Sequence, residues 1–235
     1  MELRDLTIGY GRRPLVTGIS ATLRPGQFVC LTGRNGTGKS TLLKTLAGIL
    51  PPLGGEVWLE GRPLADYRPA MLARQVGLVL TRTPELPNTT LRELVAYGRL
   101  PYLSWCCRPT AEDLEATDAA IRTLGITALA DRLLSQLSDG ERQKAMIARA
   151  LAQGTRWLLL DEPAAFLDYE SRLELMQTLT ALAHDAGRAV LLSSHDLDLV
   201  RRYADTEWHI ADGKIEISTC GKSNCNCNVK HKRKT

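Results

Sequence analysis

A glycine-rich segment at residues 33–40 has the residue types and spacing that bind a phosphate chain. It follows the apolar run 28–32 and precedes a segment of helical period, which is the context that a phosphate-binding loop requires. In such a loop the glycines let backbone N–H groups surround a phosphate, a lysine adds positive charge and a hydroxyl binds Mg²⁺. The alternative is a glycine-rich turn that caps a helix. The segment comprises Gly33, Arg34, Asn35, Gly36, Thr37, Gly38, Lys39 and Ser40, and Thr41 follows it.

Two adjacent carboxylates, Asp161 and Glu162, directly follow the apolar run 157–160. Open α/β sheets bind ligands at the carboxyl ends of their strands, so both positions suit a nucleotide site. Adjacent residues of an extended chain point to opposite sides, so that Asp161 can hold Mg²⁺ while Glu162 faces an attacking water. The alternative is a pair of acids that caps a helix ahead of Pro163.

A third pattern lies between these two. Ser138 and Glu141 have the S-x-x-E spacing of a capping box, which predicts that a helix begins there and continues to residue 152. The start of a helix presents unpaired N–H groups and positive potential, in this case near Ser138 and Gly140. Taken alone, a capping box indicates only where a helix starts.

The elements that position these residues alternate along the chain. Short apolar runs alternate with longer segments of helical period, as is typical of βαβ units and a mainly parallel sheet. From about residue 82 to residue 153 no strand pattern occurs and prolines divide helical pieces, which indicates a helical subdomain inserted into an α/β core. We expect buried strands over 28–32, 76–80, 157–160 and 189–193, and helices over 39–49, 91–98, 111–124, 141–152, 169–186 and 196–203.

The composition allows a folded domain and argues against nucleic acid as a partner. The 235 residues are 44% hydrophobic, which is enough for a core. The formal net charge is +4, but residues 222–234 hold five basic residues and no acidic one, so the rest of the chain is nearly neutral. A protein that binds nucleic acid needs a basic face. We expect residues 218–235 to be a solvated, disordered tail; contact with acidic lipid or RNA is the alternative.

The chain shows neither a membrane span nor a disulfide framework. No stretch approaches the ~20 apolar residues that cross a bilayer, and the N-terminus lacks the apolar core of a signal peptide, so we expect a cytoplasmic protein. The six cysteines lack framework spacing and are expected to be reduced, with Cys30 in the core. Cys220, Cys225, Cys227 and His231 could chelate a soft metal, although their spacing matches no regular zinc pattern.

Residues 137–144, LSDGERQK, lie between the phosphate loop and the acidic pair and resemble the signature sequence of the ATP-binding cassette (ABC) family. This resemblance implies an ATPase over residues 1–217, with an α/β core of the P-loop NTPase (RecA-like) type and an N-terminal antiparallel β region. The core would comprise 1–81 and 154–217, and the helical subdomain about 82–153. In the family the signature meets the γ-phosphate of ATP held by a second subunit. Ser138 and Gly140 would therefore bind ATP across a homodimer.

The same resemblance implies roles for further residues. Tyr10 would stack on adenine, Asp168 would lie in the loop that contacts the partner subunit, and His195 would contact the γ-phosphate. The resemblance implies catalysis by Glu162, His195 and Lys39, and Mg²⁺ held by Ser40 and Asp161. One departure concerns Thr81, which stands where the family usually has a glutamine that bridges Mg²⁺, water and the membrane partner.

Residues 90–102, TLRELVAYGRLPY, resemble the start of the helical subdomain in the ATPases of iron-siderophore, haem and cobalamin importers. This implies a subunit at the inner face of the cell membrane, bound to a polytopic permease and served indirectly by an extracytoplasmic substrate-binding protein. Three alternatives remain: an exporter ATPase, a non-transport member of the family acting in translation or DNA repair, and a regulatory cassette that binds ATP without hydrolysing it.

Overall fold

Two β-sheets frame the protein in a computed structural model that describes residues 1–81, 86–103 and 108–220. The smaller sheet is antiparallel and has the order β2-β1-β4-β5, with β1 at Glu2–Tyr10, β2 at Arg13–Thr22, β4 at Gly54–Leu59 and β5 at Arg62–Pro63. The larger sheet has the order β10-β9-β3-β8-β7-β6. Its strands are β3 (Phe28–Gly33), β6 (Val76–Val79), β7 (Trp157–Asp161), β8 (Ala189–Ser193), β9 (Thr206–Ala211) and β10 (Lys214–Thr219).

The four strands expected from the sequence are present and mutually parallel in the larger sheet, which confirms the α/β class. Each is mainly apolar because helices and the second sheet cover most of its surface. Cys30 is fully buried in β3, as expected, and burial raises the pKa of its thiol. The antiparallel N-terminal region is also present.

Strands β9 and β10 were not among the expected elements. Strand β10 lies at the edge of the sheet and is mostly exposed, so it lacks the apolar run that marks a buried strand. It includes Ser218 and Thr219, which were expected in the disordered tail, because their backbones pair with Glu207 and Thr206 of β9. Residues 221–235, with Cys225, Cys227 and His231, lie outside the described part of the chain.

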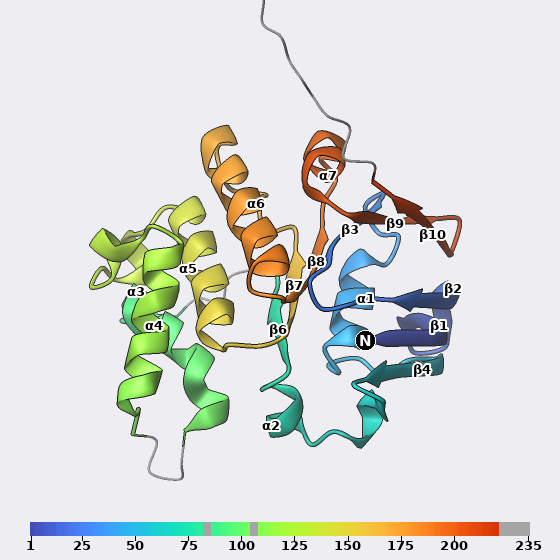
Figure 1. Cartoon of the computed structure of the whole chain (residues 1–235), viewed down its shortest axis with the longest axis horizontal. Coiled ribbons are helices and arrows are strands. Elements are labelled where there is room, and N and C mark those ends of the chain that lie inside the picture. The colour runs from blue at the N-terminus through green and yellow to red at the C-terminus, as the bar shows by residue number, and fades with distance from the viewer. Residues whose placement is uncertain (82–85, 104–107, 221–235) are drawn as a thin grey trace, which may run out of the picture.

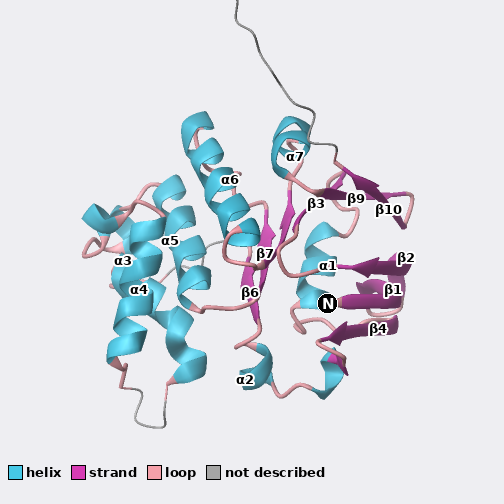
Figure 2. Ribbon diagram, in the orientation of Figure 1, coloured by secondary structure: helices cyan, strands magenta, loops and turns pink. Residues whose placement is uncertain are grey.

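The helices form layers around the larger sheet (Figures 1 and 2). Helix α1 (Lys39–Leu46) lies between the two sheets and buries Leu42, Leu43 and Leu46 in the core that they share. Helices α6 (Tyr169–His184) and α7 (Leu197–Tyr203) cover the opposite face. Helices α3 (Leu91–Ala96), α4 (Ala111–Thr123) and α5 (Asp139–Ala152) pack together beside β6 as the helical subdomain, and α2 spans Pro69–Leu72. Short 3₁₀ turns occupy Leu64–Asp66, Tyr97–Tyr102, Thr127–Leu129 and Leu134–Gln136. None of the helices in the described ranges has the length and apolar character needed to cross a membrane.

All three helices of the helical subdomain begin with the same device. In each, the N-cap hydroxyl accepts a hydrogen bond from the backbone of the third helical residue, and the acidic side chain of that residue accepts one from the N-cap backbone. The pairs are Thr90 with Glu93, Thr110 with Asp113 and Ser138 with Glu141, so the predicted capping box is confirmed. The N-cap backbone N–H is the largest cause that lowers the pKa of Glu93, Asp113 and Glu141.

Acidification is therefore expected to loosen the helical subdomain. The ordinary pKa values are 4.5 for Glu and 3.8 for Asp, and the folded values are lower, so the caps contribute fully above that range and are lost as the pH falls through the folded values. Urea unfolding followed by circular dichroism at decreasing pH should show this loss. Glu93→Gln/Glu141→Gln keeps the hydrogen-bond acceptors without titrating and should show a shallower pH dependence. If the free energy of unfolding of this variant fell with pH as steeply as that of the wild type, the stabilising role of the capping carboxylates would be contradicted.

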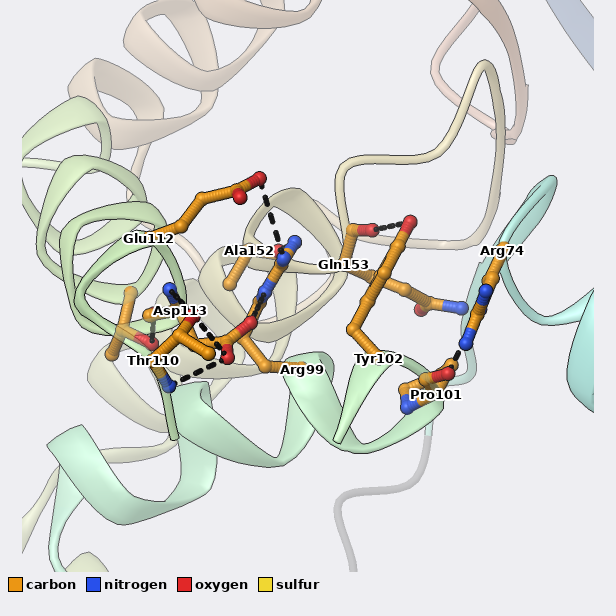
Figure 3. A network of polar contacts seen from close by, with 10 residues as sticks. Arg74, Arg99, Pro101, Tyr102, Thr110, Glu112, Asp113, Ala152 and Gln153 are labelled. Carbon is orange, nitrogen blue, oxygen red and sulfur yellow. Dashed lines mark hydrogen bonds and ion pairs between the residues drawn. The ribbon is translucent and has the colours of Figure 1, made fainter. Parts of the chain in front are cut away.

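A buried polar joint holds the parts of the helical subdomain together (Figure 3). Arg99 Nε donates to Asp113 Oδ1 of α4 at 2.8 Å, and another guanidinium nitrogen donates to the carbonyl of Ala152, the last residue of α5, at 3.1 Å. The guanidinium also lies 4.0 Å from the ring centre of Tyr102, whose hydroxyl donates to the Gln153 carbonyl at 2.9 Å. This joint gives the segment 90–102 a structural role, because its glycine–arginine end ties α3, α4 and α5 together.

Candidate functional site

The phosphate loop lies between β3 and α1, as the sequence predicted. Gly38 is the N-cap of α1 and has φ = 111°, a conformation that residues with a Cβ atom rarely adopt. Lys39 is buried, and its Nζ donates to the carbonyls of Gly33 and Arg34 at 2.8 and 3.2 Å. The Thr37 hydroxyl donates to the same Arg34 carbonyl at 2.8 Å. These bonds hold the lysine ammonium beneath the loop backbone.

A cleft of about 390 Å³ opens at this loop. It joins residues far apart in sequence, since the loop, the end of β1 and the ends of β6 and β7 all meet there. The Tyr10 ring is half exposed at its edge, and its hydroxyl accepts a hydrogen bond from Thr41 at 3.3 Å. The lining residues are Tyr10, Leu15, Asn35, Gly36, Gly38, Lys39, Ser40, Thr41, Thr81 and Glu162.

Asp161 ends strand β7 and is almost fully buried. Its carboxylate Oδ1 accepts a hydrogen bond from Ser193 Oγ at 2.8 Å, and its backbone carbonyl accepts one from the Thr81 hydroxyl at 3.1 Å. Thr81 therefore lies in the cleft beside the acidic pair. Sequence reasoning missed Ser193. The parallel pairing of 157–160 with 189–193 was the signal that could have placed Ser193 opposite Asp161.

Glu162 leaves the strand in a left-handed backbone conformation with φ = 47°. This turn directs its side chain away from the β7 core and toward both the cleft and His195. The His195 Nδ1 and the Glu162 Oε1 are 3.8 Å apart, and the imidazole is 68% exposed. His195 lines a small cavity of about 50 Å³ that adjoins Glu162, rather than the main cleft.

The signature residues form a second cluster. Ser138 caps α5 and Asp168 caps α6, where its carboxylate accepts a hydrogen bond from the Ser171 backbone at 2.8 Å, an interaction that lowers its pKa. A Cβ atom on Gly140 would lie 3.1 Å from the Phe166 carbonyl, so the two helix starts are close neighbours. Among the described residues, none of Ser138, Gly140 and Asp168 lines the cleft at the phosphate loop. One copy of the chain therefore keeps these two sets of predicted residues apart.

A second, larger groove lies between the smaller sheet, α2, β6 and α5. Its volume is about 980 Å³ and its lining is mostly apolar, with the guanidinium of Arg149 at one side. Arg149 donates to the Leu78 carbonyl at 3.1 Å, and burial lowers the pKa of its guanidinium. The lining residues include Ile49, Leu50, Pro52, Val57, Tyr67, Leu72, Met146 and Gln153.

The fold and the cleft define a class of protein. A glycine-rich loop between a parallel strand and a helix, with two acids at the end of a neighbouring strand, forms the nucleotide site of a P-loop NTPase. A family model described as ABC transporter matches residues 16–165. The chain belongs to the ABC transporter family and is an ATP-binding ATPase of that family.

Relatives and solved structures agree with this assignment. The ferric enterobactin transport ATP-binding protein FepC of Escherichia coli (strain K12) is 39% identical over 211 residues, covering 90% of this chain and 78% of the relative. The hemin import ATP-binding protein HmuV of Bordetella bronchiseptica (strain ATCC BAA-588 / NCTC 13252 / RB50) is 40% identical over 224 residues, covering 92% of this chain and 84% of the relative. A solved ATP-binding subunit of an ABC transporter aligns with a TM-score of 0.81 at 27% identity, covering 93% of this chain and 89% of that chain.

Proposed function

We propose that this chain is the ATP-hydrolysing subunit of a membrane importer for iron-siderophore complexes, haem or cobalamin. The observation that carries the proposal is the similarity over most of the chain to subunits named for ferric enterobactin transport and hemin import. The segment 90–102 adds support through its resemblance to importer ATPases, and its Arg99 binds α4 and α5 of the helical subdomain to each other. The exporter, non-transport and regulatory alternatives find no support among these relatives.

The cleft supplies groups for each part of an ATP molecule. Tyr10 at its edge would stack on the adenine ring, and Lys39 with the loop N–H groups would bind the β- and γ-phosphates. Ser40 in the cleft and Asp161, which is nearly buried at the end of β7 and does not itself line the cleft, offer the hard oxygen donors that Mg²⁺ prefers. The Mg²⁺ ion would neutralise charge on the phosphate oxygens.

Glu162 is proposed as the residue that orients or deprotonates the attacking water. Its left-handed turn presents the carboxylate to the cleft, where a water beside the γ-phosphate would lie. Lys39 and His195 would stabilise the charge that develops on the transferring phosphoryl group. Thr81, which donates to the Asp161 carbonyl, would connect this chemistry to the start of the helical subdomain.

Two copies of the chain are proposed to close head to tail on two ATP molecules. The support is that the signature residues lie outside the cleft of their own chain, at a helix start whose positive potential suits a phosphate. Ser138 and Gly140 of one copy would face the phosphate loop of the other. Asp168 would contact the partner copy.

The large apolar groove is proposed as the surface that binds the permease. It touches the core and the helical subdomain at once, so a permease segment seated in it would sense their relative movement. Its apolar lining suits a polytopic membrane protein at the inner face of the cell membrane. An extracytoplasmic substrate-binding protein would deliver cargo to that permease without touching this chain.

Co-purification from membranes tests the transport proposal. Affinity-tagged chain should recover a polytopic permease, and Ile49→Glu should lose it while retaining ATP binding, because Ile49 lines the groove and is 58% exposed. The matched control is Ile217→Glu on β10, where the isoleucine is 49% exposed and lies away from the groove. Recovery of ribosomes or DNA-repair factors, or loss of the permease with both variants, would contradict the proposal.

A further inference from the structure

Ser193 joins the two acids of the site through one hydroxyl group. It is the last residue of β8, is fully buried and pairs in register with Asp161 of β7. Its Oγ donates to Asp161 Oδ1 at 2.8 Å and accepts from the backbone N–H of Glu162 at 2.9 Å. The hydroxyl therefore uses its single proton on one acid and a lone pair on the next.

The bond to Glu162 restrains an unfavourable backbone conformation. A φ of 47° is uncommon for a residue with a Cβ atom, and such sites persist where surrounding contacts hold them. The Ser193 hydroxyl fixes the N–H of Glu162, and Ala165 N–H donates to the Glu162 carbonyl at 3.1 Å. Together these bonds hold the turn that directs the Glu162 carboxylate out of the strand.

The bond to Asp161 fixes the carboxylate rotation in the same way. One oxygen of Asp161 is held by Ser193, and the residue's backbone carbonyl is held by Thr81 at 3.1 Å. Ser193 does not itself line the cleft at the phosphate loop, where the nucleotide is proposed to bind. Its side-chain hydrogen bonds run to Asp161 and to the backbone of Glu162, so its effect on hydrolysis is expected to pass through these two acids.

We infer that Ser193 is a positioning residue for ATP hydrolysis, which sets the Mg²⁺-binding acid and the water-activating acid relative to each other. The inference rests on the roles proposed for Asp161 and Glu162. Loss of the hydroxyl frees the carboxylate of the first acid and the turn of the second in one step. It should therefore slow hydrolysis and raise the Mg²⁺ concentration that hydrolysis requires. The affinity for ATP should stay nearly unchanged.

Three variants test the inference in the full chain. Ser193→Ala should lower kcat by about 10- to 100-fold and raise the Mg²⁺ concentration for half-maximal rate, because small displacements of catalytic groups cost rates of that order. Ser193→Thr keeps the hydroxyl and should recover most of the rate, since the small cavity of about 50 Å³ beside Ser193 offers room for a methyl group. Thr155→Val is the matched control, because it removes a buried hydroxyl that bonds the Trp157 carbonyl at the other end of β7.

A cycle with Glu162→Gln separates this inference from the proposed function. If Ser193 acts through the acids, adding Ser193→Ala to Glu162→Gln should slow single-turnover hydrolysis less than it slows the wild-type chain. The role of Ser193 would be overturned if Ser193→Ala kept a kcat within twofold of wild type, or if it lost no more kcat than Thr155→Val. Either result would leave the roles proposed for Asp161 and Glu162 untouched. Wild-type hydrolysis by Glu162→Gln would overturn the role of Glu162 itself, and with it the inference about Ser193.

Discussion

Replacement of Glu162 by glutamine is expected to leave ATP affinity unchanged and to slow hydrolysis by about 10²- to 10⁴-fold, the usual contribution of a general base. Glutamine has nearly the same shape, but its amide cannot accept the proton of the attacking water. The substitution should not disturb the turn, because the bond that Ser193 makes to this residue involves the backbone N–H. Nucleotide titration and phosphate release, measured on the same preparation, test both halves of the expectation.

Dimer formation gives this prediction a second readout. If hydrolysis opens the closed pair of subunits, Glu162→Gln with MgATP should accumulate as a dimer in size-exclusion chromatography. The matched control is Glu216→Gln, which removes an exposed carboxylate from the edge strand β10 and should behave like wild type in all assays. Hydrolysis by Glu162→Gln at the wild-type rate would remove this residue from its proposed role.

The sequence predicted the parts of the fold that local pattern controls. A strand covered on both faces must be apolar throughout, so residues 28–32, 76–80, 157–160 and 189–193 could be recognised without a structure. The phosphate loop and the start of α5 carry their own chemistry in consecutive residues, since a capping box is a contact between residues three apart. Exposed strands such as β10 escape this reasoning because their pairing partner, not their composition, makes them strands.

The contacts that complete the site could not be found in this way. Ser193 bonds to Asp161 across 32 residues of sequence, and Arg99 bonds to the Ala152 carbonyl across 53. Ser193 belongs to no local motif, and the importer-like segment 90–102 does not reveal which groups its Arg99 contacts. The order of strands in the sheet brings the first pair together, and packing of α5 against α3 and α4 brings the second.

The Arg99 joint makes the helical subdomain one packed unit, as a rigid-body movement on the core would require. Arg74, which precedes β6, donates to the Pro101 carbonyl at 2.9 Å, and Gln153 after α5 donates to the Val76 carbonyl at 3.3 Å. These contacts link the base of the helical subdomain to β6 and the residues before it, and Figure 3 shows the bond between Arg74 and Pro101. They lie next to the groove proposed for the permease, since Gln153 contributes to its lining. Movement of a bound permease segment would thus act on this joint directly.

Asp113→Ala is expected to destabilise the protein by about 1–3 kcal/mol, the range for leaving a buried polar partner unpaired. The substitution removes the acceptor of Arg99 Nε, and only 9% of the Arg99 side chain is exposed. It also removes the acidic half of the α4 capping box, because the other carboxylate oxygen accepts from the Thr110 backbone at 2.9 Å. Urea unfolding followed by circular dichroism measures the loss.

The matched control is Asp118→Ala on the same helix. Asp118 forms an ion pair with Arg92 at the surface, where 38% of its side chain is exposed, and pairs of this kind contribute about 0–1 kcal/mol. A double-mutant cycle of Arg99→Leu with Asp113→Ala should give a coupling energy above that of Arg92→Leu with Asp118→Ala. If the two aspartates prove equally dispensable, the joint does not hold the helical subdomain, and another contact must transmit movement between the groove and the core.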